Sequence, residues 1–144
     1  MSQGTRCRQL AMYVIFDSPL NMLCDNPSNY KREPECTAFI ARIPTVWDET
    51  LGLDGKVGEY ITMARRSGDE WYVGGLTNWD KRDIIVDLSF LGEGFYEIEL
   101  FKDGINADRA ACDYKRVVMP VPEDRQLKVT LFPGGGFAGR IERR

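Results

Sequence analysis

Carboxylates are the side chains from which this sequence could build a catalytic site. The chain has no histidine, which excludes Ser-His-Asp and Cys-His catalysis and every histidine-ligated metal site. Paired Asp or Glu side chains can still serve as general acid, base or nucleophile. Asp48 and Glu49 are adjacent in "WDET", but neighbours on a strand point to opposite faces and cannot share one substrate. We predict that both are solvent-exposed or form interdomain hydrogen bonds.

Two further acids have local interpretations. Asp25 follows the apolar run of "DSPLNMLCDNP", residues 17–27, where Asp, Asn and Pro together favour a turn. For Glu59, in "VGEY", we predict a cross-strand or interdomain partner.

Aromatic side chains offer the second kind of chemistry, because their flat faces can stack on the apolar faces of sugar rings. The candidates are Trp47, Trp71, Tyr72 and Trp79. Trp71 and Tyr72 are neighbours in a predicted strand and point to opposite faces, so only one of them can join a platform. Packing in a core or an interface is therefore the favoured prediction for these rings.

The cysteines and glycines favour structural roles. None of the four cysteines, Cys7, Cys24, Cys36 and Cys112, belongs to a C-x-x-C pair, so we predict no zinc site and expect small buried apolar side chains. The glycine-rich "PGGGFAG" lacks the Lys-Ser/Thr of a phosphate-binding loop. We predict that it forms the turn into a last strand.

The net charge and the distribution of apolar residues exclude several classes of partner. The net charge is −3 and no basic stripe is visible, so we predict no nucleic-acid partner. No run of about 20 apolar residues exists, so we predict no membrane span. The opening "MSQGTRCRQLAMYVIF" lacks the basic start and the small-residue cleavage site of a signal peptide. We predict a buried helix there.

Residues 5–43 have helical periodicity at both ends. Residues 5–17 begin at Thr5, a favourable N-cap, and are apolar on nearly every side, so this helix must be buried on several sides. "PLNMLCD", residues 19–25, fits a short buried strand, although periodicity alone does not exclude a helical turn. "NPSNYKRE" is predicted to be a polar connection and residues 33–43 a second helix. This order is typical of an α/β layer or barrel.

The pattern changes after Pro44. Runs with two-residue alternation are separated by turn signals such as "SGDE", "LGEG" and "PED". They predict about eight short strands and an antiparallel sandwich. The predicted strands lie in "TVWDET", "KVGEYITMARR", "EWYVGGLTNW", "DIIVDLSFL", "FYEIELF", "YKRVVMPV", "QLKVTLF" and "GFAGRIER". The fold class is therefore mainly β, with a boundary at about residue 44.

Several long segments resemble one enzyme family. They are "QLAMYVIFDSPLNMLCDNPSNY", "IPTVWDET", "LDGKVGEYITMARR", "WYVGGLTNWDKRDIIVDLSFL" and "PGGGFAGRI". In this order they resemble the C-terminal end of glycoside hydrolase family 97, and the resemblance covers nearly the whole chain. Members of that family are α-glucosidases and α-galactosidases with an N-terminal β-sandwich, a central (β/α)8 barrel and a C-terminal β-sandwich.

The resemblance implies a division of the chain. Residues 1–43 would be the end of the catalytic barrel, a helix–strand–helix remnant, and residues 44–144 the C-terminal sandwich for oligomerisation and support. Asp25 would then lie at the carboxyl end of the eighth barrel strand, close to substrate, because that rim of a barrel holds the active site. The alternative is a turn former in "CDNP". In the intact enzyme Asp25 would touch substrate or orient neighbouring groups, and either of these two functions would need the other barrel strands.

The resemblance also implies what this chain lacks. The family's paired catalytic acids and its calcium-binding glutamates lie on earlier strands and loops, and their motifs do not occur here. We therefore assign no catalytic and no metal-binding residue, and expect this chain alone to be inactive, with calcium in the full-length enzyme. The expected partners are the rest of the barrel, a second copy and, for the parent, a carbohydrate. The resemblance implies a periplasmic or secreted bacterial enzyme.

Two other functions remain open from the sequence. A carbohydrate-binding sandwich would need an exposed row of aromatic rings. A free-standing adhesion or scaffold domain would have to account for the apolar helix at residues 5–17. We expect residues 5–43 either to dock onto another copy or to be poorly packed, because the missing barrel should cover them. Monomeric behaviour at high concentration, with residues 5–17 well buried inside a single chain, would contradict this expectation.

Overall fold

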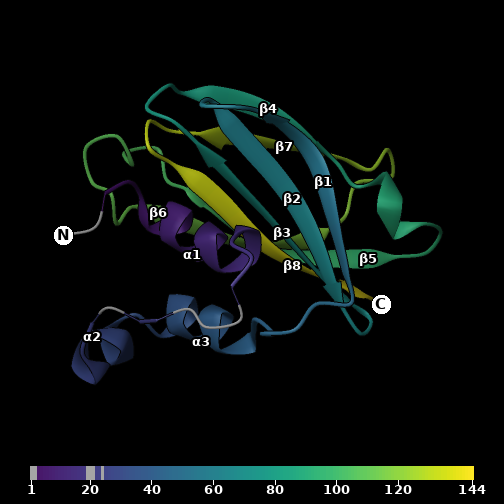
Figure 1. Ribbon diagram of the computed structural model, residues 1–144, viewed down its shortest axis with the longest axis horizontal. Helices are drawn as coiled ribbons and strands as arrows, with labels where there is room; N and C mark the ends of the chain where they lie inside the picture. The colour runs from purple at the N-terminus through teal and green to yellow at the C-terminus, as the bar shows by residue number, and fades with distance from the viewer. Residues whose placement is uncertain (1–2, 19–21, 24) are drawn as a thin grey trace.

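The computed structural model describes residues 3–18, 22–23 and 25–144. Eight strands form two antiparallel sheets (Figure 1). Their bounds are β1 (Glu49–Lys56), β2 (Tyr60–Ser67), β3 (Glu70–Thr77), β4 (Arg82–Asp87), β5 (Tyr96–Asp103), β6 (Tyr114–Pro120), β7 (Gln126–Leu131) and β8 (Gly136–Arg143). The six-stranded sheet has the order β1-β2-β3-β8-β5-β6, and β4 pairs with β7 in the second sheet.

The described residues form three helices. They are α1 (Arg6–Ile15), α2 (Pro27–Arg32) and α3 (Pro34–Arg42), and a 3-10 turn, η1 (Ser89–Leu91), follows β4. Two of the helices, α1 and α3, cover the face of the six-stranded sheet that points away from β4 and β7, and α2 lies beside α3. The side chain of Thr5 caps α1 by accepting a hydrogen bond from the Arg8 backbone N–H. Figure 1 shows α1 lying across the sheet with α3 beside it, so the domain has three layers.

The first core lies between the two sheets, and we call it the inter-sheet core. It forms because alternate residues of each strand point inward. Trp71 packs against Phe90 with ring centroids 4.5 Å apart. The buried members are all apolar: Ala64, Trp71, Val73, Val86, Leu88, Leu91, Ile98, Leu100, Val121, Leu127, Val129, Leu131, Phe137 and Ile141.

The second core lies between the helices and the six-stranded sheet, and we call it the helix–sheet core. Its buried members are Cys7, Leu10, Ala11, Val14, Ile15, Cys36, Phe39, Tyr72, Leu76, Phe101 and Ala138. Small residues let α1 approach the strands closely. A Cβ added to Gly74 in β3 would lie 3.2 Å from the Cβ of Val14, which is tighter than ordinary van der Waals contact.

Poor packing, one of the two alternatives expected for residues 5–43, is therefore wrong for α1, and docking onto another copy stays a prediction. Cys7, Ala11 and Val14 are each 0% exposed, and Leu10 is 2% exposed, within this single chain. The physical reason is that β3 and β8 offer the helix an apolar face with small residues, which the sequence pattern of a half-buried sheet does not reveal. The remaining residues of α1 are half-buried, and Phe16, which follows the helix, is exposed.

The predicted β-sandwich of about eight strands is confirmed. Three local predictions are wrong. Residues 27–32 form α2 instead of a polar connection, because Asn26 caps them and Pro27 starts the helix. Residues 89–91 form the 3-10 turn instead of continuing a strand. Met22 and Leu23 are not in a strand, and the rest of the predicted strand at 19–25 lies mostly outside the described residues.

Candidate functional site

Asp25 lies at the start of α2, where it organises the turn. Its Oδ1 accepts hydrogen bonds from the Asn26 backbone N–H and the Asn29 side-chain amide, both at 2.7 Å. Its own N–H donates to the Tyr30 hydroxyl. The two bonds to the carboxylate, first that of Asn26 and then that of Asn29, lower the pKa of Asp25 below its ordinary value. An exposed, ionised carboxylate thus stands at this helix start.

The other candidate acids are held by cations of the same chain. Asp48 accepts the Gly68 backbone N–H at 2.7 Å, and Glu49 lies 3.3 Å from Arg66. Both acids have Arg66 as an ion-pair partner. These contacts join the chain before β1 to the end of β2 and bring neither acid to Asp25. They are structural contacts of an exposed surface, which contribute little to stability.

Glu59 is also held within the chain. It pairs with Lys56 and, at 3.1 Å, with Arg82. The hydrogen bond from Lys56 is the main cause that lowers the pKa of Glu59, and Arg82 adds to it. Glu59 lies in the β1–β2 turn and its partners are at the end of β1 and the start of β4, so it does not form the predicted cross-strand pair, and an interdomain partner stays a prediction.

The aromatic residues do not form an exposed row in the described part of the chain. Trp71 belongs to the inter-sheet core, and Tyr72 belongs to the helix–sheet core beside Trp47, with ring centroids 5.4 Å apart. The predicted opposite orientation of Trp71 and Tyr72 is confirmed. Trp79 is 65% exposed, and its ring lies against Gly134 of the glycine-rich turn. A single ring gives little area for stacking on a sugar chain.

The glycine-rich segment forms a turn that fastens the start of α1. The buried Asp103 carboxylate accepts the N–H groups of Phe132 and Gly136 at 3.1 and 3.2 Å. The Gly134 carbonyl accepts the Thr5 N–H at 3.0 Å. A Cβ at Gly135 would overlap Asp103, so the carboxylate needs glycine there. Burial raises the pKa of Asp103 above its ordinary value, although these hydrogen bonds oppose the shift.

Arg65 is a buried cation that the sequence analysis missed. Its Nη1 donates to the Phe16 carbonyl at 3.3 Å, at the C-terminal end of α1, and its guanidinium lies 5.6 Å from the Trp47 ring centre. Its Nη2 is 3.8 Å from Asp17. Nε is buried with no hydrogen-bond partner in the described chain. In "MARRS" this arginine resembles a solvated charge. The sequence signal that could have found it is strand alternation, which places Arg65 on the same face of β2 as Met63.

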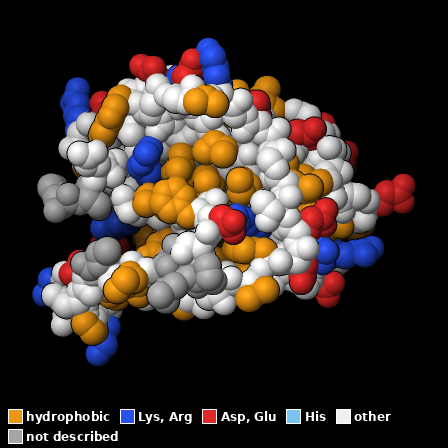
Figure 2. Space-filling view, in the orientation of Figure 1, with side chains coloured by type: hydrophobic (Ala, Val, Ile, Leu, Met, Phe, Trp, Pro, Cys, Tyr) orange, Lys and Arg blue, Asp and Glu red, His pale blue; other side chains and the backbone are white. Residues whose placement is uncertain are grey.

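Exposed apolar residues follow both α1 and α3. They are Phe16 at the end of α1, whose carbonyl accepts the Arg65 hydrogen bond, Met22 and Leu23 beyond it, and Val46 after α3. Met22 is 77% and Val46 73% exposed. Figure 2 shows further hydrophobic side chains gathered over α1 and the neighbouring strands. Exposed apolar surface rimmed by polar groups is typical of an interaction site. We call these four residues the junction surface.

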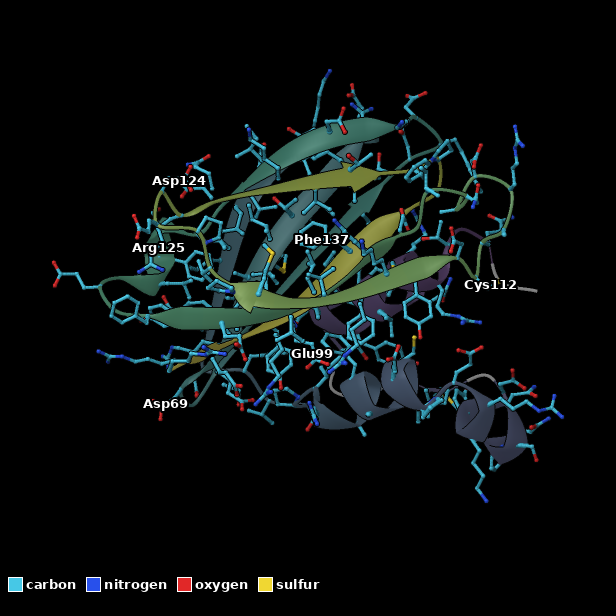
Figure 3. The ribbon with its side chains drawn as sticks, turned by 180° about the vertical axis from the view of Figure 1, so that it is seen from behind. Asp69, Glu99, Cys112, Asp124, Arg125 and Phe137 are labelled. Atoms are coloured by element: carbon cyan, nitrogen blue, oxygen red, sulfur yellow. The ribbon has the colours of Figure 1, made fainter. Side chains whose placement is uncertain are left out.

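A charged groove lies on the same sheet face beyond α3. It has a volume of about 190 Å³, and Figure 3 shows Glu99 there, between the sheet and the helices. Glu99 pairs with Arg42 at 3.4 Å and Arg116 at 2.8 Å. Arg140 pairs with Glu70 and Glu142. Because these acids and cations neutralise one another, the groove has no surplus charge to attract an ion.

The cysteine prediction is only partly correct. Cys7 and Cys36 are buried and Cys112 is exposed, while Cys24 lies outside the described residues. Burial is the main cause that raises the pKa of both Cys7 and Cys36. Among the described residues, no group of three or more Cys, Asp or Glu side chains could hold a metal ion. In the same residues no helix is long and apolar enough to cross a membrane.

A β-sandwich with a helical layer, a junction surface and candidate acids that are engaged by nearby groups has the properties of an interaction domain. Comparison with known proteins gives its family. Residues 46–142 match the model described as "Glycosyl-hydrolase 97 C-terminal, oligomerisation". Because the match spans most of the chain, this chain belongs to the family of glycosyl hydrolase 97 C-terminal domains, and the resemblance seen in the sequence is confirmed.

Curated and solved relatives agree with this assignment. A retaining alpha-galactosidase of Bacteroides thetaiotaomicron is 68% identical over 142 residues, which are 99% of this chain and 22% of that protein. A probable retaining alpha-galactosidase of Streptomyces bingchenggensis is 32% identical, over 90% of this chain and 19% of that protein. A family 97 enzyme of Pseudoalteromonas sp. strain K8, solved with panose, is 36% identical with a TM-score of 0.92, covering 99% of this chain and 23% of that one. This chain thus spans about a fifth of the length of these relatives.

Proposed function

We propose that this chain is the C-terminal accessory region of a retaining α-galactosidase of family 97, in which it supports the catalytic barrel and joins copies of the enzyme. The 68% identity to the Bacteroides thetaiotaomicron enzyme carries this proposal. The family description, which includes oligomerisation, supports the second role. A periplasmic or secreted location is part of the proposal and rests on the family resemblance.

We assign the catalytic chemistry to parts of the enzyme outside this chain. The carboxylates that the sequence offered, Asp48, Glu49 and Glu59, are engaged with nearby cations or backbone groups. Calcium in the full-length enzyme is a proposal from the family. The described residues supply no group of acidic ligands that fits calcium, so we assign no metal-binding role to this chain.

The junction surface is the proposed contact with the barrel. Burying Phe16, Met22 and Leu23 against an apolar partner would contribute favourable free energy, because burial of such a side chain is worth about 1.5–3 kcal/mol. Arg65 would hold the end of α1 in place below them through its bond to the Phe16 carbonyl. In this arrangement residues 1–43 form the end of the barrel, and Asp25 lies at its substrate rim.

Turnover by the purified 144-residue chain tests the proposal. We expect no hydrolysis of p-nitrophenyl α-galactoside or α-glucoside above the rate without protein. Activity that persists through repeated purification would overturn the assignment of the catalytic acids to other parts of the enzyme. Retention on galactan or starch resin, compared with an uncharged resin, would instead favour the carbohydrate-binding alternative.

A further inference from the structure

We propose that two copies of this chain join through the open edge of β6, paired antiparallel about a two-fold axis at Val117. This inference rests on the homo-oligomer in the proposed function and names the surface that forms it. β6 is the last strand of the six-stranded sheet and, among the described residues, pairs only with β5. Figure 3 shows the strand that follows Cys112 crossing the near side of the molecule with no other strand in front of it.

Two backbone hydrogen bonds establish which groups of β6 point outward. The Gly104 N–H donates to the Asp113 carbonyl, and the Val121 N–H donates to the Tyr96 carbonyl. Asp113 and Val121 therefore both bond to β5. Because hydrogen-bonded positions recur at every second residue of an antiparallel strand, Val117, midway between them, also bonds to β5. The N–H groups of Arg116 and Val118 therefore point away from the sheet. Pro120 falls at an outward position, where a missing N–H breaks no bond to β5.

The two edges of the six-stranded sheet differ. At the β1 edge the register shifts between Gly52 and Asp54, and the Asp54 carboxylate is occupied by Gly55 and Tyr60. Bulges and charges of this kind protect a sheet edge from further pairing. β6 pairs with β5 without any shift from Tyr114 to Pro120. It is the regular edge, and the one suited to receive another strand.

Symmetry and hydrogen bonding then select one register. A two-fold axis perpendicular to the sheet keeps each side chain on its own face, and opposed residues of paired strands also share a face. Opposed residues must therefore be an even number of positions apart, which places one residue opposite its own copy at the axis. With Val117 there, Arg116 faces Val118 of the second copy and their outward N–H and C=O groups pair in both directions. The Tyr114 N–H of one copy donates to the Pro120 carbonyl of the other. Every outward N–H of β6 then has an acceptor.

The side chains are compatible with this register. Val118 is 49% exposed and would be covered. Arg116 is already paired with Glu99 of its own chain at 2.8 Å, so no unpaired arginine would enter the contact. Lys115 faces Met119 of the second copy and stays away from the second Lys115. An axis at Arg116 would instead oppose two arginines, which is unfavourable.

Val118→Pro tests the edge, because it removes an outward N–H and leaves the bonds to β5 intact. We expect wild-type chain to sediment as a dimer over a concentration series. Val118→Pro should raise the dimer dissociation constant by about 100-fold or more, since each dimer loses two donors and leaves two carbonyls unpaired. Val118→Thr, which keeps the N–H and the branched shape, should remain a dimer.

Cysteine cross-linking tests the strand register by a second measurement, which does not depend on a proline variant that could disturb folding. In a background with Cys24→Ser and Cys112→Ser, Val117→Cys should form an intermolecular disulfide, because residues opposed at such a position have Cα atoms about 4.5 Å apart. Val118→Cys should not cross-link to itself, because its diagonal neighbour is about 7–8 Å away.

The outcomes separate this inference from the proposed function. A dimer that survives Val118→Pro, or one in which Val118→Cys cross-links and Val117→Cys does not, overturns the β6 contact and leaves the homo-oligomer standing. A wild-type chain that is monomeric throughout the concentration series overturns both. A dimer lost in Val118→Pro, with the Val117→Cys cross-link formed, supports the β6 contact.

Discussion

The inter-sheet core and the helix–sheet core lie on opposite faces of one sheet, yet they differ in composition. Beside the apolar cluster of the inter-sheet core lie two buried neutral residues, Thr62 and Thr77, which share a face with Ala64 and Val73. The helix–sheet core contains two cysteines and Tyr72, and it is bordered by the buried groups Arg65 and Asp103. The first core therefore defines the sandwich mainly by apolar packing. The second attaches a helical layer through a few polar contacts at the two ends of α1.

This difference predicts two kinds of response to mutation. A cavity in the inter-sheet core removes packing on which both sheets depend, so the whole domain should lose stability. Loss of a polar contact at an end of α1 should loosen the helical layer first. Local opening of one layer is measurable, because amide exchange reports the stability of each element separately.

Phe137→Ala should have the largest effect. Phe137 is 0% exposed in the inter-sheet core, and truncation of a buried phenylalanine costs about 3–5 kcal/mol. Urea unfolding followed by tryptophan fluorescence measures the change, and exchange should accelerate in strands and helices alike. Unfolding free energy reduced by less than 1 kcal/mol, or exchange confined to the helices, would contradict the role given to this core.

Arg65→Ala should have an intermediate and more local effect. The change removes the bond to the Phe16 carbonyl and the contact with the Trp47 ring. Hydrogen bonds to charged groups contribute about 1.5–3 kcal/mol. We expect faster amide exchange in α1 with little change in β5 and β8. Arg65→Met is the matched control, because it keeps much of the packing and removes the charge, and it should cost less.

Asp103→Asn should have the smallest effect and a dependence on pH. Burial raises the folded-state pKa of Asp103 above 3.8, so the folded chain binds this proton more tightly than the unfolded chain. The free energy of unfolding of the wild type should then fall relative to that of Asp103→Asn as pH rises from about 4 through that raised pKa. Below about pH 4 the wild type should retain this contribution in full. Urea unfolding of both proteins at several pH values measures the difference, which we expect to stay under about 1 kcal/mol. A stability difference that is constant, or that changes in the opposite direction, would show that burial of Asp103 does not control it.

The sandwich was predictable because its signals are local. Alternation within short runs and turn signals between them located seven of the eight strands. The remaining strand, β1 (Glu49–Lys56), overlaps the predicted "TVWDET" only at its first two residues. Helix α2 was missed because "PSNYKR" has no apolar face, and its formation depends on the cap from Asn26. The close packing of α1 was missed because Gly74 and Ala138 gain meaning only when a helix lies over them.

The interaction surfaces were less accessible to sequence reasoning. Arg65 is one of two adjacent arginines in β2, and only the fold shows that it is buried while Arg66 remains at the surface. The junction surface combines residues from three separate segments, so no single window of the sequence contains it. The acid singled out by the resemblance, Asp25, is placed at a helix start, and its role at a substrate rim stays a prediction.

The position of β8 has a consequence for biosynthesis. This strand, formed by Gly136–Arg143, lies between β3 and β5 and is the last strand along the chain. The β2–β3 and β5–β6 hairpins can form as they emerge from the ribosome, but the sheet that joins them must wait for residues translated afterwards. Until then their unpaired edges are open to wrong partners. Chaperones that hold nascent chains would protect this domain at the end of its translation.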